Sequence, residues 1–220
     1  MGKYILITAA GEGTRFGGDE LKQFAPVNGK PLLLHVFTAF LNVDASFRFV
    51  LVLPEAGINR WKELCARYSF NVPHQIVAGG KTRSASVKNG LKHIPENSLV
   101  AIHDGVRPFV SPTVIEKGFK LADVSGSAVP VVELTDSVRI LEGNNNKALN
   151  RELLRKVQTP QFFHSKIIKQ AYRSFTGTYA TDDATVYEQS GYKVTLFTGN
   201  RQNIKITFPE DIIVAEAMLK

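Results

Sequence analysis

The chain has 220 residues, of which 44% are hydrophobic and 21% charged, and its 27 Lys and Arg against 20 Asp and Glu give a formal net charge of +7. This length predicts a single domain over residues 1–220, the composition excludes a disordered or collagen-like chain, and the single cysteine, Cys65, excludes a disulfide framework. The apolar runs are far shorter than the roughly 20 residues that span a bilayer, and the N-terminus has no signal-peptide architecture. We therefore expect a cytoplasmic protein with no membrane partner.

Short apolar runs alternate with longer segments of helical period through the first part of the chain. This alternation predicts an α/β fold, in which a mostly parallel sheet carries helices on both faces. In chain order, the predicted elements are a strand at 4–8, a helix at 31–41, a strand at 47–53, a helix at 58–68, a strand at 75–78, a helix at 82–93, a strand at 99–103, a helix at 111–122 and a strand at 128–132.

The hydrophobic period changes after residue 133. Two short, partly alternating pieces at 138–141 and 147–149 flank a turn-forming Gly-Asn-Asn-Asn run, which indicates a β-hairpin and not a crossover helix. We expect residues 133–157, hereafter the arm, to protrude from the sheet with this hairpin. Beyond the arm, the pattern predicts helices at 165–175 and 182–189, strands at 193–198 and 203–207, and a helix from residue 209 to the C-terminus.

Positive charge is concentrated between Lys147 and Arg173, where seven basic residues accompany one acid, Glu152. The resulting charge of +6 favours acidic partners such as phosphorylated metabolites, nucleotides or nucleic acid. Apolar residues interrupt the basic ones in a pattern suited to packing. Both a solvated basic face and a phosphate-binding wall therefore fit this segment.

A glycine-rich turn follows the first predicted strand and contains Gly11 and Gly13. Glycines at such a turn let the backbone approach a polyphosphate closely, with several N–H groups directed at its oxygens. The turn is not a dinucleotide-binding fingerprint, because Phe16 stands where that motif needs glycine, and it has no Gly-Lys-Ser/Thr of a P-loop. Arg15 and Lys22 add two cations that can hold a triphosphate. A Gly-x-Gly taken alone also fits an ordinary turn between elements.

Six short motifs follow one another along the whole chain. They are Ala9-Ala10-Gly11 to Arg15 with Lys22-Gln23-Phe24, Gly79-Gly80 with Arg83 and Ser86-Val87, His103–Pro108, Gln158–Phe162, Thr181–Ala184, and Asn203–Thr207 ahead of Pro209–Asp211. In this order the chain resembles the 2-C-methyl-D-erythritol 4-phosphate cytidylyltransferases of non-mevalonate isoprenoid synthesis, a family of Rossmann-like nucleotidyltransferases. The resemblance implies a Rossmann-like fold and transfer of CMP from CTP to a polyol phosphate, with release of pyrophosphate.

The resemblance also implies a role for individual residues. The implied catalytic residues are Arg15, Lys22, Arg151 and Lys205. The implied nucleotide-binding residues are Ala9, Ala10, Gly11, Glu12, Gly13, Gly80, Arg83 and Ser86. The implied acceptor-binding residues are Asp104, Arg107, Arg151 and Lys205. The family further implies Mg²⁺ or another divalent cation bound largely through the CTP phosphates, and a homodimer in which the arm of one subunit reaches its partner's site.

This assignment agrees with the chemistry of the reaction. An acceptor phosphate attacks the α-phosphorus of CTP, so no enzyme nucleophile is needed, and catalysis depends on positioning and on charge stabilisation. The chain has no Gly-x-Ser-x-Gly motif and no clustered carboxylates that would form a dedicated metal site. Asp182 and Asp183 fit the N-terminus of a helix, where we expect them to act as carboxylate caps and not as metal ligands.

Two alternatives to this function remain at the level of the sequence. The family usually has two alanines between the acidic residue and the arginine of its strand-end motif, where this chain has Gly105 and Val106. Ribitol-5-phosphate cytidylyltransferases tolerate Val there, so ribitol 5-phosphate is an alternative acceptor, although the motifs at 157–161 and 182–184 fit the methylerythritol branch better. A basic nucleotide- or nucleic-acid-binding module is a remote alternative, because no aromatic stacking platform accompanies the basic segment, and we expect no nucleic-acid partner.

Overall fold

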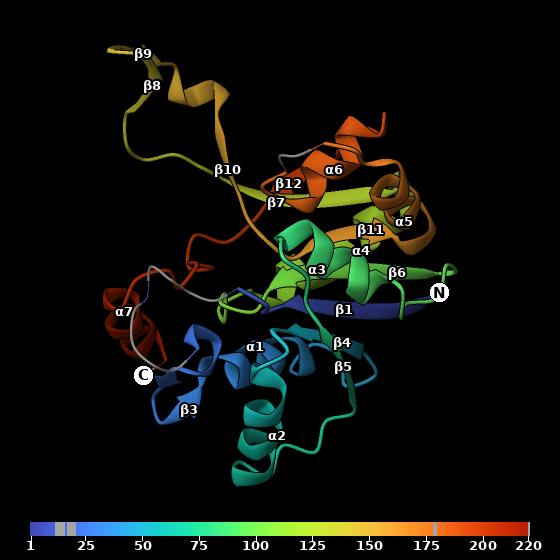
Figure 1. Ribbon diagram of the computed structural model, residues 1–220. Coiled ribbons are helices and arrows are strands. Elements are labelled where there is room, and N and C mark those ends of the chain that lie inside the picture. Colours follow the sequence, from blue (N-terminus) through green and yellow to red (C-terminus); the bar gives the residue numbers. More distant parts are fainter. Residues whose placement is uncertain (12–15, 17–20, 178–179, 220) are drawn as a thin grey trace.

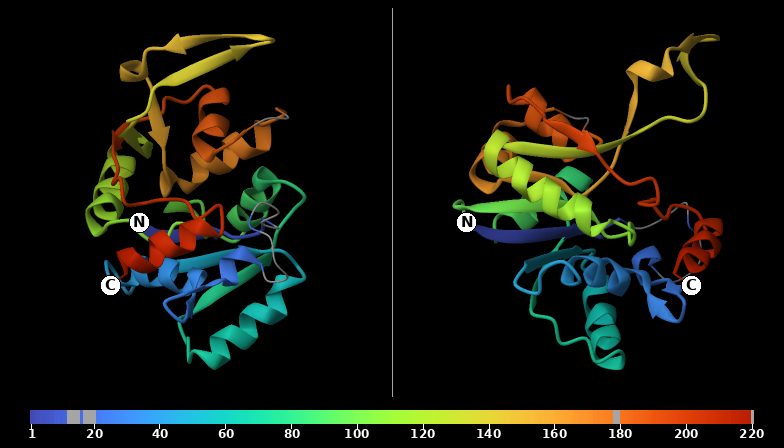
Figure 2. Two further views of the ribbon diagram at one scale, coloured as in Figure 1. Left: turned by 90° about the vertical axis from the view of Figure 1, so that its left-hand side faces the viewer. Right: turned by 180° about the vertical axis from the view of Figure 1, so that it is seen from behind.

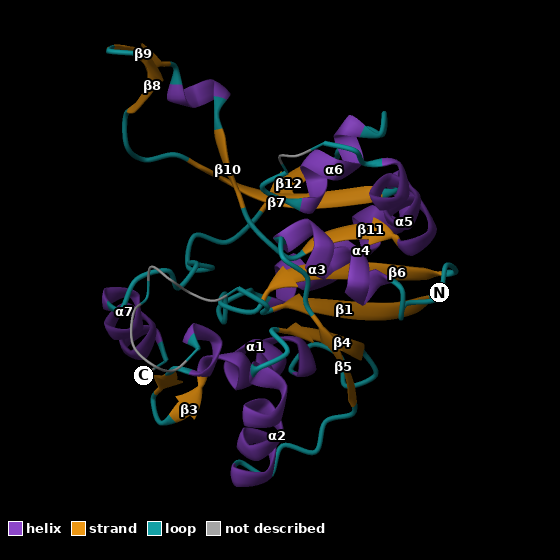
Figure 3. Ribbon diagram, viewed as in Figure 1, coloured by secondary structure: helices purple, strands orange, loops and turns teal. Residues whose placement is uncertain are grey.

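A central β-sheet organises the chain in the computed structural model, which describes residues 1–11, 16, 21–177 and 180–219. The strand order is β10-β7-β11-β6-β1-β4-β5, and β12 also pairs with β7 (Figures 1 and 3). The strands of this sheet are β1 Gly2–Thr8, β4 Arg48–Leu53, β5 His74–Ala78, β6 Ser98–Asp104, β7 Ser127–Glu133, β10 Arg155–Val157, β11 Gln161–His164 and β12 Leu196–Thr198. Two small sheets pair β2 Pro26–Val27 with β3 Lys30–Pro31, and β8 Val138–Glu142 with β9 Asn145–Leu149.

Seven α-helices lie within the described residues. They are α1 Leu32–Leu41, α2 Gly57–Arg67, α3 Arg83–Leu91, α4 Pro112–Ser125, α5 Ser165–Ser174, α6 Asp183–Gln189 and α7 Glu210–Met218, and the 3-10 turns are η1 Lys22–Phe24 and η2 Arg151–Leu153. In the described part of the chain, none of these helices has the length and apolar character needed to cross a bilayer.

The centre of the sheet is parallel and covered on both faces. Strand β1 lies between β4 and β6 and runs parallel to both, and its residues Ile5, Leu6 and Ile7 are fully buried. Ile5 and Ile7 belong to the hydrophobic cluster formed with α1, α2 and α4, whereas Leu6 belongs to the cluster formed with α3, α5 and α6. Because successive side chains of a strand point to opposite faces, a continuous apolar run is what a doubly covered strand requires. The predicted α/β fold with helices on both faces is confirmed.

The carboxyl ends of the parallel strands meet at one edge of the sheet. Thr8 is in register with Val52 of β4 on one side and with Asp104 of β6 on the other. Just beyond these positions, the Gly105 N–H donates to the Thr8 carbonyl at 2.9 Å, and the Gly79 N–H donates to the Leu53 carbonyl at 2.7 Å. The loops that follow β1, β5 and β6 therefore leave the sheet close together, although they are far apart in sequence.

Strand β11 is absent from the elements that the sequence predicts, and it changes the topology. It inserts between β6 and β7 and pairs antiparallel with both, so β7 does not lie beside β6. The predicted strand at 203–207 is wrong, since these described residues form no ladder and are joined to the loop after β6 by a hydrogen bond from the Ile206 N–H to the Val106 carbonyl at 2.9 Å. The predicted strand at 193–198 is reduced to β12.

A hairpin is present where the sequence predicts one. Strands β8 and β9 pair antiparallel from Val138 opposite Leu149 to Glu142 opposite Asn145, and Gly143 in the turn has a φ of +59°. All views in Figures 1 and 2 show this hairpin projecting away from the rest of the chain. Strand β10 then returns the chain to the sheet beside β7.

Candidate active site

A cavity of about 490 Å³ opens at the carboxyl edge of the parallel strands, the usual place for a ligand in an open α/β sheet. Nine of the residues that the resemblance implies lie around it, contributed by the loops after β1 and β5, by η1, by α3, by β6 and by the segment after β12. They are Ala9, Ala10, Gly11, Lys22, Gly80, Arg83, Ser86, Asp104 and Lys205. Glu12, Gly13 and Arg15 lie outside the described residues, and their roles stay predictions.

The glycine-rich turn is held at both of its described ends. The Ala9 N–H donates to the Val52 carbonyl at 2.9 Å, and the buried Gln23 side chain donates from Nε2 to the Ala9 carbonyl at 2.7 Å. Gln23 follows Lys22 in η1, so this bond fixes the position of Lys22 relative to the end of β1. The end of β1 and the 3-10 turn η1, which the glycine-rich turn separates in sequence, are thereby brought to the same side of the cavity.

The opposite wall is the loop from β5 into α3. Ser86 Oγ accepts from the Gly80 N–H at 3.0 Å and donates to the Thr82 carbonyl at 3.0 Å, while Thr82 Oγ1 accepts from the Ala85 N–H as the N-cap of α3. A Cβ on Gly79 would lie 2.4 Å from the Ala10 Cβ, so only glycine lets this loop approach the first loop so closely. The N-terminus of α3 faces the cavity, where its free N–H groups and dipole favour an anion.

Asp104, at the end of β6, is the centre of a cluster of cations. Its carboxylate lies 3.0 Å from Lys205 Nζ, 3.2 Å from Arg107 Nε and 3.6 Å from Arg83 Nε. Burial opposes ionisation of Asp104, but the positive charges of Lys205, Arg83 and Arg107 outweigh it and hold the pKa of this carboxyl well below its usual range. Asp104 is therefore a permanent anion that fixes three cations at the border of the cavity.

A second cavity, of about 290 Å³, adjoins the first. Arg83, Asp104 and Lys205 line both, and the second is bounded further by Arg107, Thr159 and other residues of the loop before β11 and the start of α6. Two hollows that share a cationic border can hold two anionic ligands with their charged ends close together.

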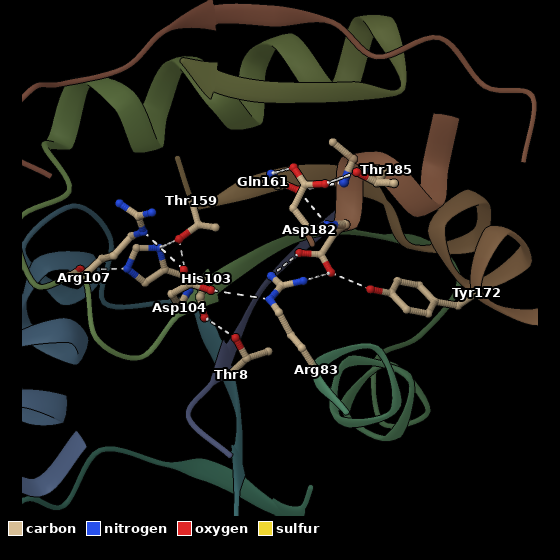
Figure 4. Close-up of polar contacts among 12 residues, drawn as sticks. Thr8, Arg83, His103, Asp104, Arg107, Thr159, Gln161, Tyr172, Asp182 and Thr185 are labelled. Atoms are coloured by element: carbon tan, nitrogen blue, oxygen red, sulfur yellow. Dashed lines mark hydrogen bonds and ion pairs between the residues drawn. The ribbon is translucent and has the colours of Figure 1, made fainter. Parts of the chain in front are cut away.

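A buried histidine, His103, is hydrogen-bonded to two residues of the second cavity, Arg107 and Thr159 (Figure 4). His103 Nε2 lies 2.9 Å from the Arg107 carbonyl, which can only accept, so this nitrogen carries the proton. Thr159 Oγ1 then donates to His103 Nδ1 at 3.1 Å and accepts from the Asp104 N–H at 3.1 Å. Burial lowers the pKa of His103 to about 4, so the ring is neutral at neutral pH and positions Asp104 without exchanging protons.

Arg107 links the end of β6 to the segment that carries Lys205. Its Nε contacts Asp104, and its Nη1 donates to the Asn203 carbonyl at 2.9 Å. Asn203 in turn donates from Nδ2 to the Thr159 carbonyl at 2.7 Å. These bonds, and not a β-ladder, hold the segment that presents Lys205.

Arg151 lies apart from the other implied catalytic residues that the structure describes, Lys22 and Lys205. It is in η2 on the arm, where its side chain is exposed and donates to the Thr135 carbonyl, and it is not among the described residues that line either cavity. Within one chain the structure thus brings Lys22 and Lys205 together at one cavity and leaves Arg151 outside it.

Asp182 and Asp183 turn out to have different roles. Asp182 is the predicted N-cap of α6, since its Oδ1 accepts from the Thr185 N–H at 2.9 Å. Asp183 is no cap: its side chain is fully buried and faces Arg83. The sequence gives one signal for this difference. A helix N-terminus needs a single capping residue, so the second acid, Asp183, is not required as a cap. Lys81, which also lines the larger cavity, is not singled out by the sequence motifs.

Burial of Arg83 disfavours its charge, but the carboxylates of Asp183 and Asp104 more than compensate and raise the pKa of the guanidinium above its ordinary value. Among the described residues, no group of three or more His, Cys, Asp or Glu side chains is arranged to hold a metal ion.

A Rossmann-like sheet with a glycine-rich first loop and a cationic border between two cavities defines a nucleotidyltransferase. Comparison with known proteins gives the family. The model of the family described as 2-C-methyl-D-erythritol 4-phosphate cytidylyltransferase (IspD) matches residues 4–220, and the chain belongs to this family. It is 43% identical to the protein of that name from Bacteroides thetaiotaomicron, over 100% of both chains, and 45% identical to that from Porphyromonas gingivalis, over 99% of this chain and 97% of the other.

Solved structures agree with this assignment. The crystal structure of 2-C-methyl-D-erythritol 4-phosphate cytidylyltransferase from Thermus thermophilus superposes with a TM-score of 0.82 at 32% identity, covering 99% of this chain and 98% of that one. The 4-diphosphocytidyl-2C-methyl-D-erythritol synthase from Anaerococcus prevotii superposes with a TM-score of 0.84 at 30% identity, covering 99% and 96%.

Proposed function

We propose that this protein transfers CMP from CTP to 2-C-methyl-D-erythritol 4-phosphate, giving 4-diphosphocytidyl-2-C-methyl-D-erythritol and pyrophosphate in the synthesis of isoprenoid precursors. Family membership supports the reaction, and one structural observation carries it: two adjoining cavities share a border of Arg83, Asp104 and Lys205. CTP would occupy the larger cavity between the glycine-rich turn and the N-terminus of α3. The acceptor would occupy the smaller cavity, with its phosphate at the shared border.

In this arrangement an oxygen of the acceptor phosphate attacks the α-phosphorus of CTP. A new P–O bond forms as the bond to the β-phosphate oxygen breaks, and the electron pair leaves with pyrophosphate. Both reactants are anions. Side chains can therefore lower the reaction barrier mainly by reducing the repulsion between the reactants and by stabilising the charge that develops on the phosphates. Lys22 on one wall and Lys205 at the shared border are the described side chains that we assign to this task, with Arg15 as a predicted third.

The divalent cation, Mg²⁺ in our proposal, enters as part of the nucleotide substrate. Among the described residues, Asp104 is the carboxylate that lines both cavities, and its oxygens already face Lys205, Arg83 and Arg107. A cation bound mainly through the triphosphate and water fits this donor set, since Mg²⁺ keeps several waters and often takes only one or two protein ligands.

We further propose a cytoplasmic homodimer in which the arm completes the partner's site. Two features of the arm support exchange: Leu141 and Leu153 are 79% and 81% exposed, and Arg151 is not among the described residues that line either cavity of its own chain. Mixing the inactive variants Lys22→Ala and Arg151→Ala tests this, because shared sites would restore part of the activity in the mixed dimer. No recovery, with dimers present, would contradict arm exchange.

The acceptor is tested directly with purified protein, CTP and Mg²⁺. Pyrophosphate release with methylerythritol phosphate, and little with ribitol 5-phosphate, is the expected result. The opposite preference would show that Gly105 and Val106 mark a different acceptor. The comparisons do not favour that alternative, since the family and these relatives carry the methylerythritol name. Salt-dependent binding to oligonucleotides with no pyrophosphate release would instead support a nucleic-acid-binding module.

A further inference from the structure

Asp183 has a fully buried side chain, and the reaction described above does not use its contact. Its carboxylate accepts from Arg83 Nη1 at 3.0 Å and from Arg83 Nη2 at 2.6 Å, which is a two-pronged ion pair. The Tyr172 hydroxyl donates to Asp183 Oδ1 at 2.6 Å. Asp183 belongs to α6 and Tyr172 to α5, whereas Arg83 begins α3, so the contact joins three helices.

The start of α6 does not need this carboxylate for its own hydrogen bonds. Gln161 Oε1 accepts from the Asp183 N–H at 3.1 Å and from the Ala184 N–H at 2.8 Å. Asp182 accepts from the Thr185 N–H and is itself held by Gln161 Nε2 at 2.9 Å. The helix is therefore capped by its neighbours, and the Asp183 side chain is directed at Arg83 alone among the described cations.

Arg83 stands where the two substrates must meet. It lines both cavities, and its Nε lies 3.6 Å from Asp104 at their shared border. An arginine side chain loses about 2 kcal/mol of rotamer freedom when it is fixed. Here the fixing is already complete in the folded chain, because Asp183 holds both terminal nitrogens, while each of these keeps one further N–H for a ligand.

We propose that Asp183, supported by Tyr172, is a positioning residue that fixes Arg83 between the nucleotide and acceptor cavities, so that the spare N–H groups of Arg83 contact the reacting phosphates. This inference rests on the proposed function. A guanidinium that is fixed before the substrates bind contributes most when they react, so loss of Asp183 lowers kcat more than it raises KM.

The decisive variants are Asp183→Asn, which keeps the shape but replaces one acceptor by an amide donor facing Arg83, and Arg83→Lys, which keeps the charge but loses the two-pronged geometry. We expect each to lower kcat by about 10²-fold, as misplacement by about 1 Å does, with KM for CTP changed less than about threefold. We expect the double variant to be no worse than either single variant, because both remove the same contact. Tyr172→Phe, which keeps the ring packing, should lower kcat severalfold.

The matched control is Glu96→Gln, which breaks the exposed ion pair between Glu96 and Arg173 at 3.0 Å and should leave kcat unchanged. Circular dichroism gives the folded fraction of each variant at the assay temperature. Where Asp183→Asn does not fold, Arg83→Lys and Tyr172→Phe decide the question. The proposal is overturned if the folded variants keep kcat within about twofold of the unmodified protein, or if the losses at Asp183 and Arg83 multiply. Absence of pyrophosphate release from the unmodified protein would instead contradict the proposed function itself.

Discussion

Lys205 offers the sharpest test of charge stabilisation at the shared border. Its Nζ lies 3.0 Å from Asp104, and its side chain is 41% exposed, so it is anchored at one side and open to the cavities on the other. Replacement by Met keeps an unbranched side chain of similar length and removes the ammonium group with its charge. Asp104 would still face Arg83 and Arg107, so we expect the variant to fold with a melting temperature close to that of the unmodified protein.

The size of the effect follows from Coulomb's law. A unit charge about 4 Å from a phosphate interacts by about 4 kcal/mol at an effective dielectric constant near 20, which corresponds to about 10³ in rate if it acts only in the transition state. Partial exposure and the opposing charge of Asp104 reduce this value, so we expect kcat to fall by about 10²- to 10³-fold, the range seen when one charge-stabilising donor is removed.

The assay is the initial rate of pyrophosphate release with saturating CTP and acceptor. Lys120→Met, on the exposed outer side of α4, is the control for loss of a lysine and should leave the rate unchanged. A folded Lys205→Met protein whose kcat lies within about tenfold of the unmodified protein would refute the reasoning.

Three further predictions concern the glycine-rich turn, the buried histidine and the core. Lys22→Ala and Arg15→Ala should each lower kcat by about 10²- to 10³-fold with little change in unfolding temperature, and near-normal kcat in either would remove that residue from the mechanism. His103 has a folded pKa of about 4 against about 6.5 when unfolded, so the unfolded chain binds the extra proton between these values. The free energy of unfolding should fall by roughly 3 kcal/mol as pH drops from about 6.5 to about 4, measured by urea titration, and a flat profile there would contradict the buried neutral ring. Gly118→Ala should destabilise the fold by about 2 kcal/mol, because its Cβ would lie 2.1 Å from the buried Phe162 ring, and an unchanged melting temperature would show that the ring can move.

Local sequence patterns predict the elements of the parallel half of the sheet. Strand β1 is a run of apolar residues that ends in a glycine-rich turn, and Ser111 with Pro112 marks the start of α4, where Ser111 Oγ accepts from the Val114 N–H at 3.3 Å. Such signals depend on residues that lie close together in sequence. They also predict which loops border the larger cavity, because parallel strands end at one edge.

The missed features depend on contacts between distant segments. Strand β11 has only four residues, Gln161–His164, and becomes a strand because β6 and β7 offer free edges on both sides. The segment at 203–207 has strand-like residues but pairs with no strand among the described residues, and side-chain bonds from Arg107 and Asn203 hold it instead. The contact between Asp183 and Arg83 is not predicted for the same reason, since the two residues are 100 positions apart in the chain.

Two carboxylates, Asp104 and Asp183, face the cations of the shared border and offset their charge. Arg83, Arg107 and Lys205 each lie within 3.6 Å of Asp104, so without this counter-charge they would repel one another. Asp104 contacts all three, and Asp183 neutralises Arg83 through its two terminal nitrogens, whereas Asp104 faces its Nε. Because these two carboxylates face cations that already outnumber them, an excess of positive charge stays directed at the cavities. Asp104 and Asp183 therefore hold the cations in place beside the cavities, an arrangement that suits the proposed approach of two phosphates.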